Sequence, residues 1–571
     1  FMRIYHWLPF WFVFFVTTHL GGFVDAVRQG ITGTAVAAVS MSLMNYLMPG
    51  GAGLLSRDPE SIKRALLPGG YSTPATLLCA LLFVYGVSFF KGDVGTKQYA
   101  LALFSNWICL FMNPATEKGF RAILWDWNFE WNWNGIAMCE IWLILLAMVL
   151  SVVPLGFFPC SRSWREKHTC LGHAARSIHD LALDTKGCLA WLLTNFVEKT
   201  LVFDGESSFA YIRQLGARRT TIEGLLAQAT WECYGEASSA HLRVLWRFSD
   251  LLRGLRQMLR VELEHVRSLG HTATAMHTSE VAEHLTDYLS ACGDALSTFA
   301  DHAQSGELGG QSAQRVSDAA QRADRALIAS LERLNAADSS MGELALIDSL
   351  RSWPALIRQA LGECEGKPST GTPPAKLAAQ DSRVPLCGHF FAVKNTVIWT
   401  LALWWAVCRR GYNSGCVVCC TSLIFSATSG STFDRNINRM VGIGMGLGIG
   451  NVPAILVMHG MNGEPGAGSL PCLAAYFVLM FVMWSVGIYG YLASGSKYSY
   501  ACLLWVGFAG VQMLRHIQTF DRSRGLFVEI VDNFFACFLV FLVDVAITYF
   551  FSVSTSKQLH AAAYECISEI A

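Results

Sequence analysis

The sequence carries little charge for its length. Lysine, arginine, aspartate and glutamate make up 15% of its 571 residues, whereas hydrophobic residues make up 53%. A soluble protein normally has about 25% charged residues, so the composition argues against a wholly soluble chain. Its 43 basic and 43 acidic residues balance to a formal net charge of zero. The chain therefore lacks the basic excess that would predict a nucleic-acid partner.

Sequence motifs of catalysis are also missing. No Walker loop, nucleophile elbow or metalloprotease helix occurs, so ATP hydrolysis on this chain and the common hydrolase mechanisms are not expected. The 18 cysteines show no paired metal spacing. Those in apolar stretches, such as Cys419 and Cys420, are typical of small core residues. We therefore expect no enzyme, no metal site and no bound cofactor.

Long apolar stretches, in contrast, are abundant. About 20 mostly apolar residues cross the core of a bilayer. Five such stretches precede the middle of the chain and six follow it: 4–20, 29–48, 72–91, 98–115 and 135–158, then 392–410, 412–430, 437–459, 469–491, 497–515 and 525–551. The sequence therefore predicts an all-α polytopic, integral membrane protein with the lipid bilayer as a partner. The choice between a plasma and an organellar membrane stays open.

The two apolar halves share landmarks in the same order. Aligning Arg28 with Arg439 places Gly33 on Gly444, and a Gly-Thr-Lys or Gly-Ser-Lys triplet opens a later stretch in each half. This pattern predicts an internal repeat of a multi-helix membrane unit. Secondary transporters commonly have this architecture, with the substrate path between the repeats.

The first half is one helix short of the second. The alignment pairs 4–20 with 412–430, so 392–410 has no partner in the first half. We expect the intact protein to carry a further membrane helix, and any targeting segment, before Phe1. The predicted architecture is two parallel repeats of six transmembrane helices, related by an axis along the membrane normal, with the first helix of the first repeat missing here.

A block of different composition separates the two halves. It holds most of the charge, places apolar residues at three- and four-residue spacing, and has almost no proline before Pro354. This pattern predicts a soluble helical bundle, and the Pro, Gly, Ser and Thr content after it predicts a linker. The expected domains are a first transmembrane repeat at 1–159, a soluble helical domain at 160–365, a linker at 366–385, a second transmembrane repeat at 386–556 and a C-terminal tail at 557–571.

Two arginines mark the candidate substrate-binding site. Arg439 lies with Asn436 and Asn438 at the start of one apolar stretch, and Arg28 lies with Asp25 at the comparable place. An arginine at a membrane boundary can simply extend to the lipid headgroups. The alternative is that paired guanidinium groups near a pseudo-twofold axis bind a carboxylate in bidentate fashion, aided by positive helix N-termini. The second interpretation predicts an anionic substrate.

A run of alternate glycines follows the second of these arginines. Small residues four positions apart let helix backbones approach closely in lipid, and a smooth helix could alternatively let its neighbours slide during transport. The residues expected to pack helices in this way are Gly33, Gly442, Gly444, Gly446 and Gly450.

Carboxyl groups inside apolar stretches are energetically costly and are therefore candidate functional groups. Glu140 lies in the last stretch of the first half, and Asp532 and Asp544 lie in the last stretch of the second. A buried carboxyl group can take up and release a proton, as proton-coupled export requires. The alternative is a neutral or hydrogen-bonded carboxyl group near a helix end.

Taken together, these features resemble the fusaric-acid-resistance and aromatic-acid-exporter family. The segment Asn436–Gly444 is similar to that family's Arg-x-x-Gly-Thr-x-x-Gly stretch, as is Arg28–Thr34, although Ile443 and Gly444 stand where Gly-Thr is expected. Plant aluminium-activated malate channels are similar over one six-helix unit followed by a helical domain. The resemblance implies export or permeation of organic or aromatic carboxylates by a dimer.

The leading hypothesis is thus a secondary transporter or channel for small organic anions, working as a homodimer or within a larger membrane assembly. The alternative is a non-transporting accessory or scaffold subunit of a larger membrane complex. That scaffold would have lost the charged residues along the path, whereas a transporter keeps polar side chains that converge between the repeats.

Overall fold

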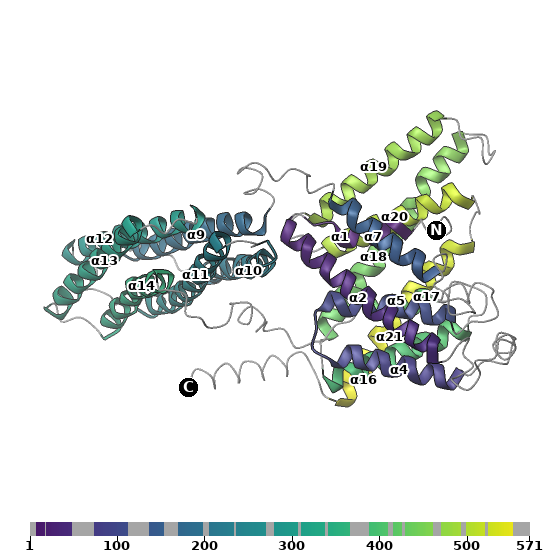
Figure 1. Ribbon diagram of the computed structural model, residues 1–571. Helices are drawn as coiled ribbons and strands as arrows, with labels where there is room; N and C mark the ends of the chain where they lie inside the picture. The colour runs from purple at the N-terminus through teal and green to yellow at the C-terminus, as the bar shows by residue number, and fades with distance from the viewer. Residues whose placement is uncertain are drawn as a thin grey trace, which may run out of the picture. The chain divides into compact units, whose positions relative to one another are not determined.

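The structure, a computed structural model (Figure 1), describes most of the chain. The described residues are 7–17, 19–47, 73–111, 136–152, 169–197, 205–232, 236–269, 279–305, 310–336, 341–365, 388–408, 415–424, 429–460, 470–492, 498–519 and 524–551. They form α-helices and contain no strand, which confirms the predicted all-α fold. The expected linker at 366–385 and the expected tail at 557–571 lie outside the described residues.

The chain divides into two compact units. The first, called here the apolar unit, comprises residues 1–17, 26–156 and 382–571, and the second, called the helical bundle, comprises residues 18–25 and 157–381. The bundle therefore includes a short segment from near the start of the chain as well as the central block. The repeat alignment does not reveal this segment, because its contacts join residues far apart in sequence.

The helices of the apolar unit overlap the apolar stretches of the sequence, although several have different bounds. They are α1 (Leu8–Phe15), α2 (Leu20–Leu47), α4 (Thr73–Phe89), α5 (Val94–Phe111), α7 (Ile136–Val152), α16 (His389–Cys408), α17 (Gly415–Leu423), α18 (Ser429–Gly460), α19 (Leu470–Leu492), α20 (Ser499–Thr519) and α21 (Arg524–Phe551). Two of them, α2 and α18, start eight or more residues before the stretches predicted at 29–48 and 437–459. These early starts place Arg28 and Arg439 inside their helices.

Helix contacts in the apolar unit follow a paired pattern. Helix α1 packs on α20 and α7, and helix α17 packs on α5 and α21. If α1 is matched with α17, α5 with α20 and α7 with α21, the α1–α20 contact corresponds to the α17–α5 contact. In the same way, the α1–α7 contact corresponds to the α17–α21 contact. Further packing joins α18 and α19 to α20, and α16 to α4, α17 and α21.

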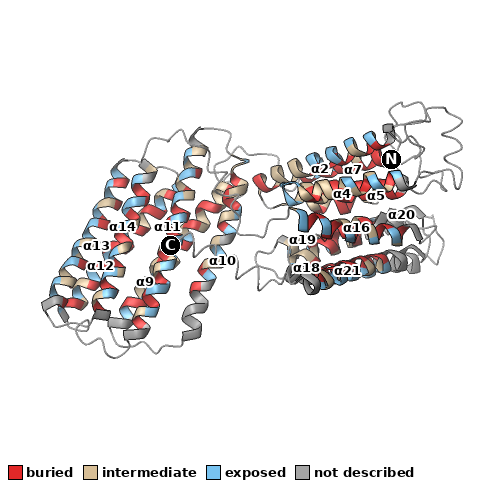
Figure 2. Cartoon of the chain, turned by 90° about the horizontal axis from the view of Figure 1, so that it is seen from below, coloured by how far each residue is buried: buried red, intermediate tan, exposed pale blue. Residues whose placement is uncertain are grey.

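The apolar unit exposes several large apolar side chains and buries several charged ones. Large apolar side chains are exposed on α4, α7, α19 and α21, and they include Leu82, Val149, Phe481 and Phe538. Figure 2 colours the exposed positions of the chain pale blue and the buried ones red. The charged side chains that lie buried instead are Lys97, Glu140, Lys394, Arg439, Asp532 and Asp544. Water-soluble proteins rarely bury charges or expose large contiguous apolar faces.

The length and apolar composition of the helices identify fewer membrane spans than the sequence predicts. Among the described residues, only the stretch Ile530–Ile547 of α21 is both long and apolar enough to cross a membrane by itself. Shorter apolar stretches lie in α4, α7, α19 and α20. By this criterion the described residues hold one candidate span, rather than the five and six that the sequence predicts.

Where the structure describes the helical bundle, it has six long helices, α9 (Cys170–Val197), α10 (Gly205–Ala229), α11 (Glu236–Leu269), α12 (Ser279–Ser305), α13 (Gly310–Ala336) and α14 (Met341–Glu365). Leucine and alanine at three- and four-residue spacing give each helix one apolar face, and these faces enclose a single core. Helix α12 packs between α9 and α13, and α11 packs against α14, α9 and α10. The charged faces point outward.

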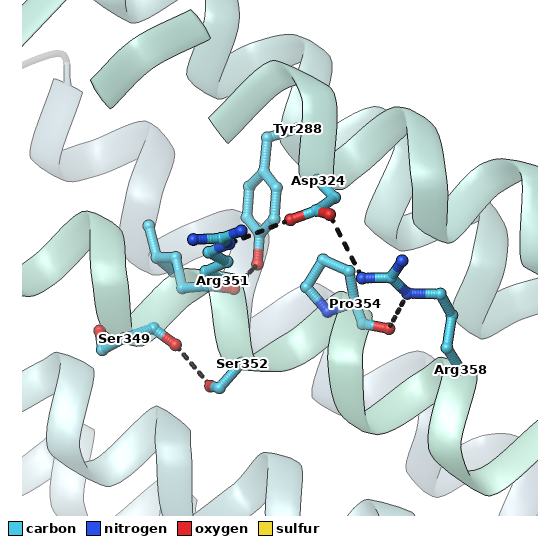
Figure 3. A network of polar contacts seen from close by, with 8 residues as sticks. Tyr288, Asp324, Ser349, Arg351, Ser352, Pro354 and Arg358 are labelled. Atoms are coloured by element: carbon cyan, nitrogen blue, oxygen red, sulfur yellow. Dashed lines mark hydrogen bonds and ion pairs between the residues drawn. The ribbon is translucent and has the colours of Figure 1, made fainter. Parts of the chain in front are cut away.

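Figure 3 shows how the bundle accommodates a proline inside α14. Pro354 has no N–H, so the carbonyl oxygen of Leu350, four residues earlier, loses its helical partner. The buried Tyr288 hydroxyl donates a hydrogen bond to that oxygen at 3.0 Å. Near it, the Asp324 carboxylate accepts from Arg351 at 3.4 Å and from Arg358 at 3.2 Å. These bonds fix α14 to its two neighbours at the proline.

The Glu232 carboxylate, just after α10, holds the starts of two helices. Its oxygens accept hydrogen bonds from the backbone N–H groups of Cys170 at 2.8 Å and Leu171 at 3.1 Å in α9, and from the N–H of Gly21 in α2. A Cβ at Gly21 would lie within 3.0 Å of the Gln228 backbone, so glycine permits this approach. The first N–H groups of a helix lack partners within that helix, and a carboxylate is their strongest acceptor. This contact explains why α2 starts early.

Candidate functional site

Arg439 lies within helix α18 and not at its start. The helix begins at Ser429, which places Arg439 in the third turn, and α2 begins at Leu20, which places Arg28 there too. The prediction that helix N-termini add positive charge at these arginines is therefore wrong, because that effect falls off within the first turn. The sequence misplaced the helix starts because glycines lie in the first turn of α2, and glycine, serine and threonine make up that of α18.

The Arg439 side chain is completely buried among neutral groups. Its relative exposure is 0%. Its Nη1 donates to the Tyr500 hydroxyl and its Nη2 to the Asn533 side-chain oxygen, both at 3.4 Å. The same oxygen of Asn533 accepts from the Cys420 thiol at 2.8 Å. Four helices, α17, α18, α20 and α21, thus contribute to the surroundings of one guanidinium group.

No carboxylate neutralises Arg439 in the described part of the chain. The ion pairs there do not include it, and its Nε has no hydrogen-bond partner. Its two hydrogen bonds are long for N–H···O contacts, which are strongest near 2.9 Å. A buried, unpaired charge destabilises a fold by several kcal/mol. No described carboxylate offsets this penalty for Arg439.

The predicted neighbours of Arg439 lie close to it on α18. Asn436 and Asn438 are both buried. The Asn436 amide nitrogen donates to the backbone oxygen of Cys537 at 3.2 Å, while its side-chain oxygen has no partner in the described residues. Asn436 therefore ties α18 to α21 beside the arginine. Sequence reasoning missed Tyr500, Asn533 and Cys420, because nothing in their local sequence distinguishes them from ordinary helix residues.

Arg28 has a different environment from Arg439. Its side chain is 34% exposed and its Nη2 pairs with Asp93 at 2.7 Å. Since Asp93 precedes α5, this ion pair joins α2 to the α4–α5 connection. No described contact joins Arg28 to Arg439, and Arg28 pairs with a carboxylate whereas the hydrogen-bond partners of Arg439 are neutral.

The glycine run of α18 has one packed face and one open face. Cβ atoms added to Gly442, Gly446 and Gly450 would approach the backbone of α20 to within 2.5, 2.9 and 2.9 Å. Gly444, like Gly448, has open space around it. In the first half, a Cβ on Gly33 would come within 2.6 Å of the backbone of α5. The packed glycines bring α18 against α20 directly beyond Arg439, whereas Gly33 and Gly444 lie in different environments.

The three carboxyl groups singled out from the sequence are all buried. Glu140 on α7 accepts hydrogen bonds from Asn106 at 2.7 Å and from the Trp107 indole at 2.5 Å, both on α5. Cys419 lies within electrostatic range of both Glu140 and Arg439. Asp532 lies on α21, one position before the Asn533 that contacts the arginine. Cys419 thus connects the surroundings of Glu140 with those of Arg439.

The third carboxyl group, Asp544, forms a buried ion pair with Lys394. The pair joins α21 to α16, and the second oxygen of Asp544 has no hydrogen-bond partner in the described residues. A second buried lysine, Lys97, donates to the Ser88 backbone oxygen at 3.2 Å and lies 5.6 Å from the centre of the Phe391 ring. Sequence reasoning considered only acids inside the apolar stretches, although a lysine at such a position is an equally strong signal.

The described residues contain no cluster of three or more His, Cys, Asp or Glu side chains placed to hold a metal ion. Their cysteines are free thiols, most of them buried. Comparison of the chain with protein-family models, with curated proteins and with solved structures found no match.

Proposed function

We propose that the apolar unit spans a membrane and carries small organic anions, with Arg439 as the cation that binds them. The observation that carries this proposal is a guanidinium group at 0% exposure whose partners are all neutral. Two unit charges 4 Å apart attract by about 4 kcal/mol at an effective dielectric constant near 20. A bound anion would therefore offset much of the desolvation penalty of Arg439.

The surroundings suit a carboxylate. A guanidinium fork matches the two oxygens of a carboxylate. The Tyr500 hydroxyl accepts one N–H of Arg439 and keeps its own proton for a second hydrogen bond to the anion. The family resemblance implies organic or aromatic acids as substrates, and this part of the proposal rests on the sequence.

The inverted polarity of the apolar unit supports a membrane environment. Helices in lipid expose apolar side chains and turn charged ones inward, as the exposed Phe481 and the buried Lys394 exemplify. The paired contacts of α1 with α20 and of α17 with α5 support two related membrane repeats in parallel orientation. Several of these helices are shorter than a full span, so in this proposal they cross the bilayer as a group.

Flux measurements test the proposal. The full chain is reconstituted in liposomes, and benzoate efflux is compared for wild type, Arg439→Gln and the control Lys91→Gln, which removes an exposed cation of the same unit. We expect Arg439→Gln to lose at least about tenfold in flux, since a hydrogen-bonded charge contributes roughly 1.5–3 kcal/mol. The control should match wild type.

A stability measurement separates binding from folding. Removing an unpaired buried charge should leave the thermal midpoint of Arg439→Gln equal to or above that of wild type. Benzoate should raise the midpoint of wild type and not that of the variant, because only a bound ligand stabilises the folded state. A wild-type chain that neither moves nor binds benzoate would instead favour the scaffold hypothesis.

The Lys394–Asp544 pair is the candidate coupling element. Protonation of Asp544 would break the ion pair that joins α16 to α21, so a proton could alter the packing of these helices. Asp544→Asn should then abolish the response of benzoate flux to a pH gradient while some flux remains. If benzoate flux through the wild-type protein does not change with the pH gradient either, the protein is a channel and not a proton-coupled transporter.

A further inference from the structure

The helical bundle carries a cluster of arginines that the proposed function does not use. Arg219 on α10 and Arg253 and Arg256 on α11 come together where these helices pack. Arg219 is the most enclosed, with 14% of its side chain exposed. Like charges repel, so three neighbouring guanidinium groups require nearby anions.

In the described residues, carboxylates form ion pairs with only two of the three arginines. Glu223 pairs with Arg219 and also, at 3.0 Å, with Arg253. Asp250 lies 3.4 Å from Arg253. In the described part of the chain, Arg256 has no carboxylate within ion-pair distance. The Nε of Arg219 is buried and has no hydrogen-bond partner.

Gly216 on α10 creates the space for Arg256. A Cβ built at Gly216 would overlap the Arg256 guanidinium, so the arginine lies directly over the helix where a side chain is missing. This position brings it towards Arg219, one turn further along α10. Burial lowers the pKa of Arg219, and the charges of Arg253 and Arg256 lower it further.

We propose that Arg219 and Arg256 form a binding site for a phosphate group on the surface of the bundle. A phosphate monoester carries nearly two negative charges and three acceptor oxygens, which is enough to accept from the free Nε of Arg219 and from the fork of Arg256 together. A carboxylate has only two oxygens and one charge. The phosphate group belongs either to a soluble compound or to a lipid headgroup. This site lies in the bundle and goes beyond the proposed transport function.

Binding is tested on the full chain in detergent, with inorganic pyrophosphate as the probe and calorimetry as the readout. Arg256→Gln should weaken binding by about tenfold, as the loss of a charged hydrogen-bonding partner does. Gly216→Ala should weaken it similarly although it changes no charge, because the added methyl group displaces Arg256. The helix itself should tolerate alanine well.

The matched control is Arg243→Gln, which removes an exposed arginine about 20 Å earlier along α11. A lipid arm uses the chain in phosphatidylcholine vesicles with and without phosphatidic acid, and follows hydrogen exchange in α10 and α11. Pyrophosphate binding in detergent identifies a soluble ligand, and protection only by phosphatidic acid identifies a headgroup; either result supports the site. No effect of either probe, equal loss in Arg243→Gln, or wild-type binding by Gly216→Ala would overturn it. None of these readouts depends on transport.

Discussion

Replacing Glu262 with glutamine should stabilise the helical bundle, and increasingly so as the pH rises. Glu262 on α11 is fully buried. Its Oε1 accepts a hydrogen bond from the Trp353 indole at 2.7 Å, and its Oε2 has no partner in the described residues. Burial raises the pKa of Glu262 from 4.5 to about 8, against the opposing effect of the Trp353 hydrogen bond. The carboxyl group is thus neutral in the folded bundle at neutral pH and ionised in the unfolded chain.

The direction of the pH effect follows from proton binding. Between pH 4.5 and pH 8 the folded bundle holds a proton that the unfolded chain has lost, so stability falls as the pH rises through this window. At 1.36 kcal/mol per pKa unit, the loss attributable to Glu262 is roughly 2 kcal/mol at pH 6, 3 at pH 7 and 4 at pH 8. Glutamine keeps the acceptor for Trp353 and does not ionise, so it avoids this loss.

Hydrogen exchange of the full chain provides the measurement. The free energy of opening of α11 and α14 is compared between wild type and Glu262→Gln at pH 6 and pH 8, which cancels the contributions of other titrating groups. We expect the advantage of the variant to grow by roughly 2 kcal/mol between these values. An advantage that stays constant with pH would refute the raised pKa, and a variant less stable than wild type at pH 8 would refute the role of burial.

Three further predictions concern packing and capping. Tyr288→Phe should destabilise the bundle by about 1–3 kcal/mol because it leaves a buried carbonyl without a partner; in a Pro354→Ala background, where the helical N–H returns, hydrogen exchange should show a smaller loss. Glu232→Gln should weaken protection at the starts of α2 and α9, with a loss of about 1–2 kcal/mol that spares the other bundle helices. Gly446→Ala should lower the thermal midpoint through overpacking of about 1–3 kcal/mol against α20, whereas Gly448→Ala, on the open face, should leave the midpoint unchanged or raise it.

The hydrophobic pattern predicted where most helices lie, but not all of their bounds. The apolar stretches locate α4 and α19 to within a few residues, and the three- and four-residue spacing identifies the bundle. The start of α2 was not predictable, because the Glu232 that caps it is 211 positions away from Gly21. Local sequence does not encode such a partner.

The candidate site was predictable only in part. Arg439 stands out in the sequence as a cation beside an apolar stretch, but its burial depends on α20 and α21 closing over it. Arg28 also lies beside an apolar stretch, but it forms a partly exposed ion pair with Asp93. Sequence alignment treats the two arginines as equivalent, and their packing makes them different.

The contact between Glu232 and the first turn of α2 bears on how the protein can be dissected. The bundle takes residues 18–25 from within the first apolar half and residues 157–381 from between the two halves. The bundle is therefore not formed by one continuous stretch of sequence, and no single fragment contains all of it without part of the first apolar half. A fragment of residues 157–381 would leave Glu232 without its Gly21 donor. Shuffling this region between proteins would have to move the beginning of α2 along with it.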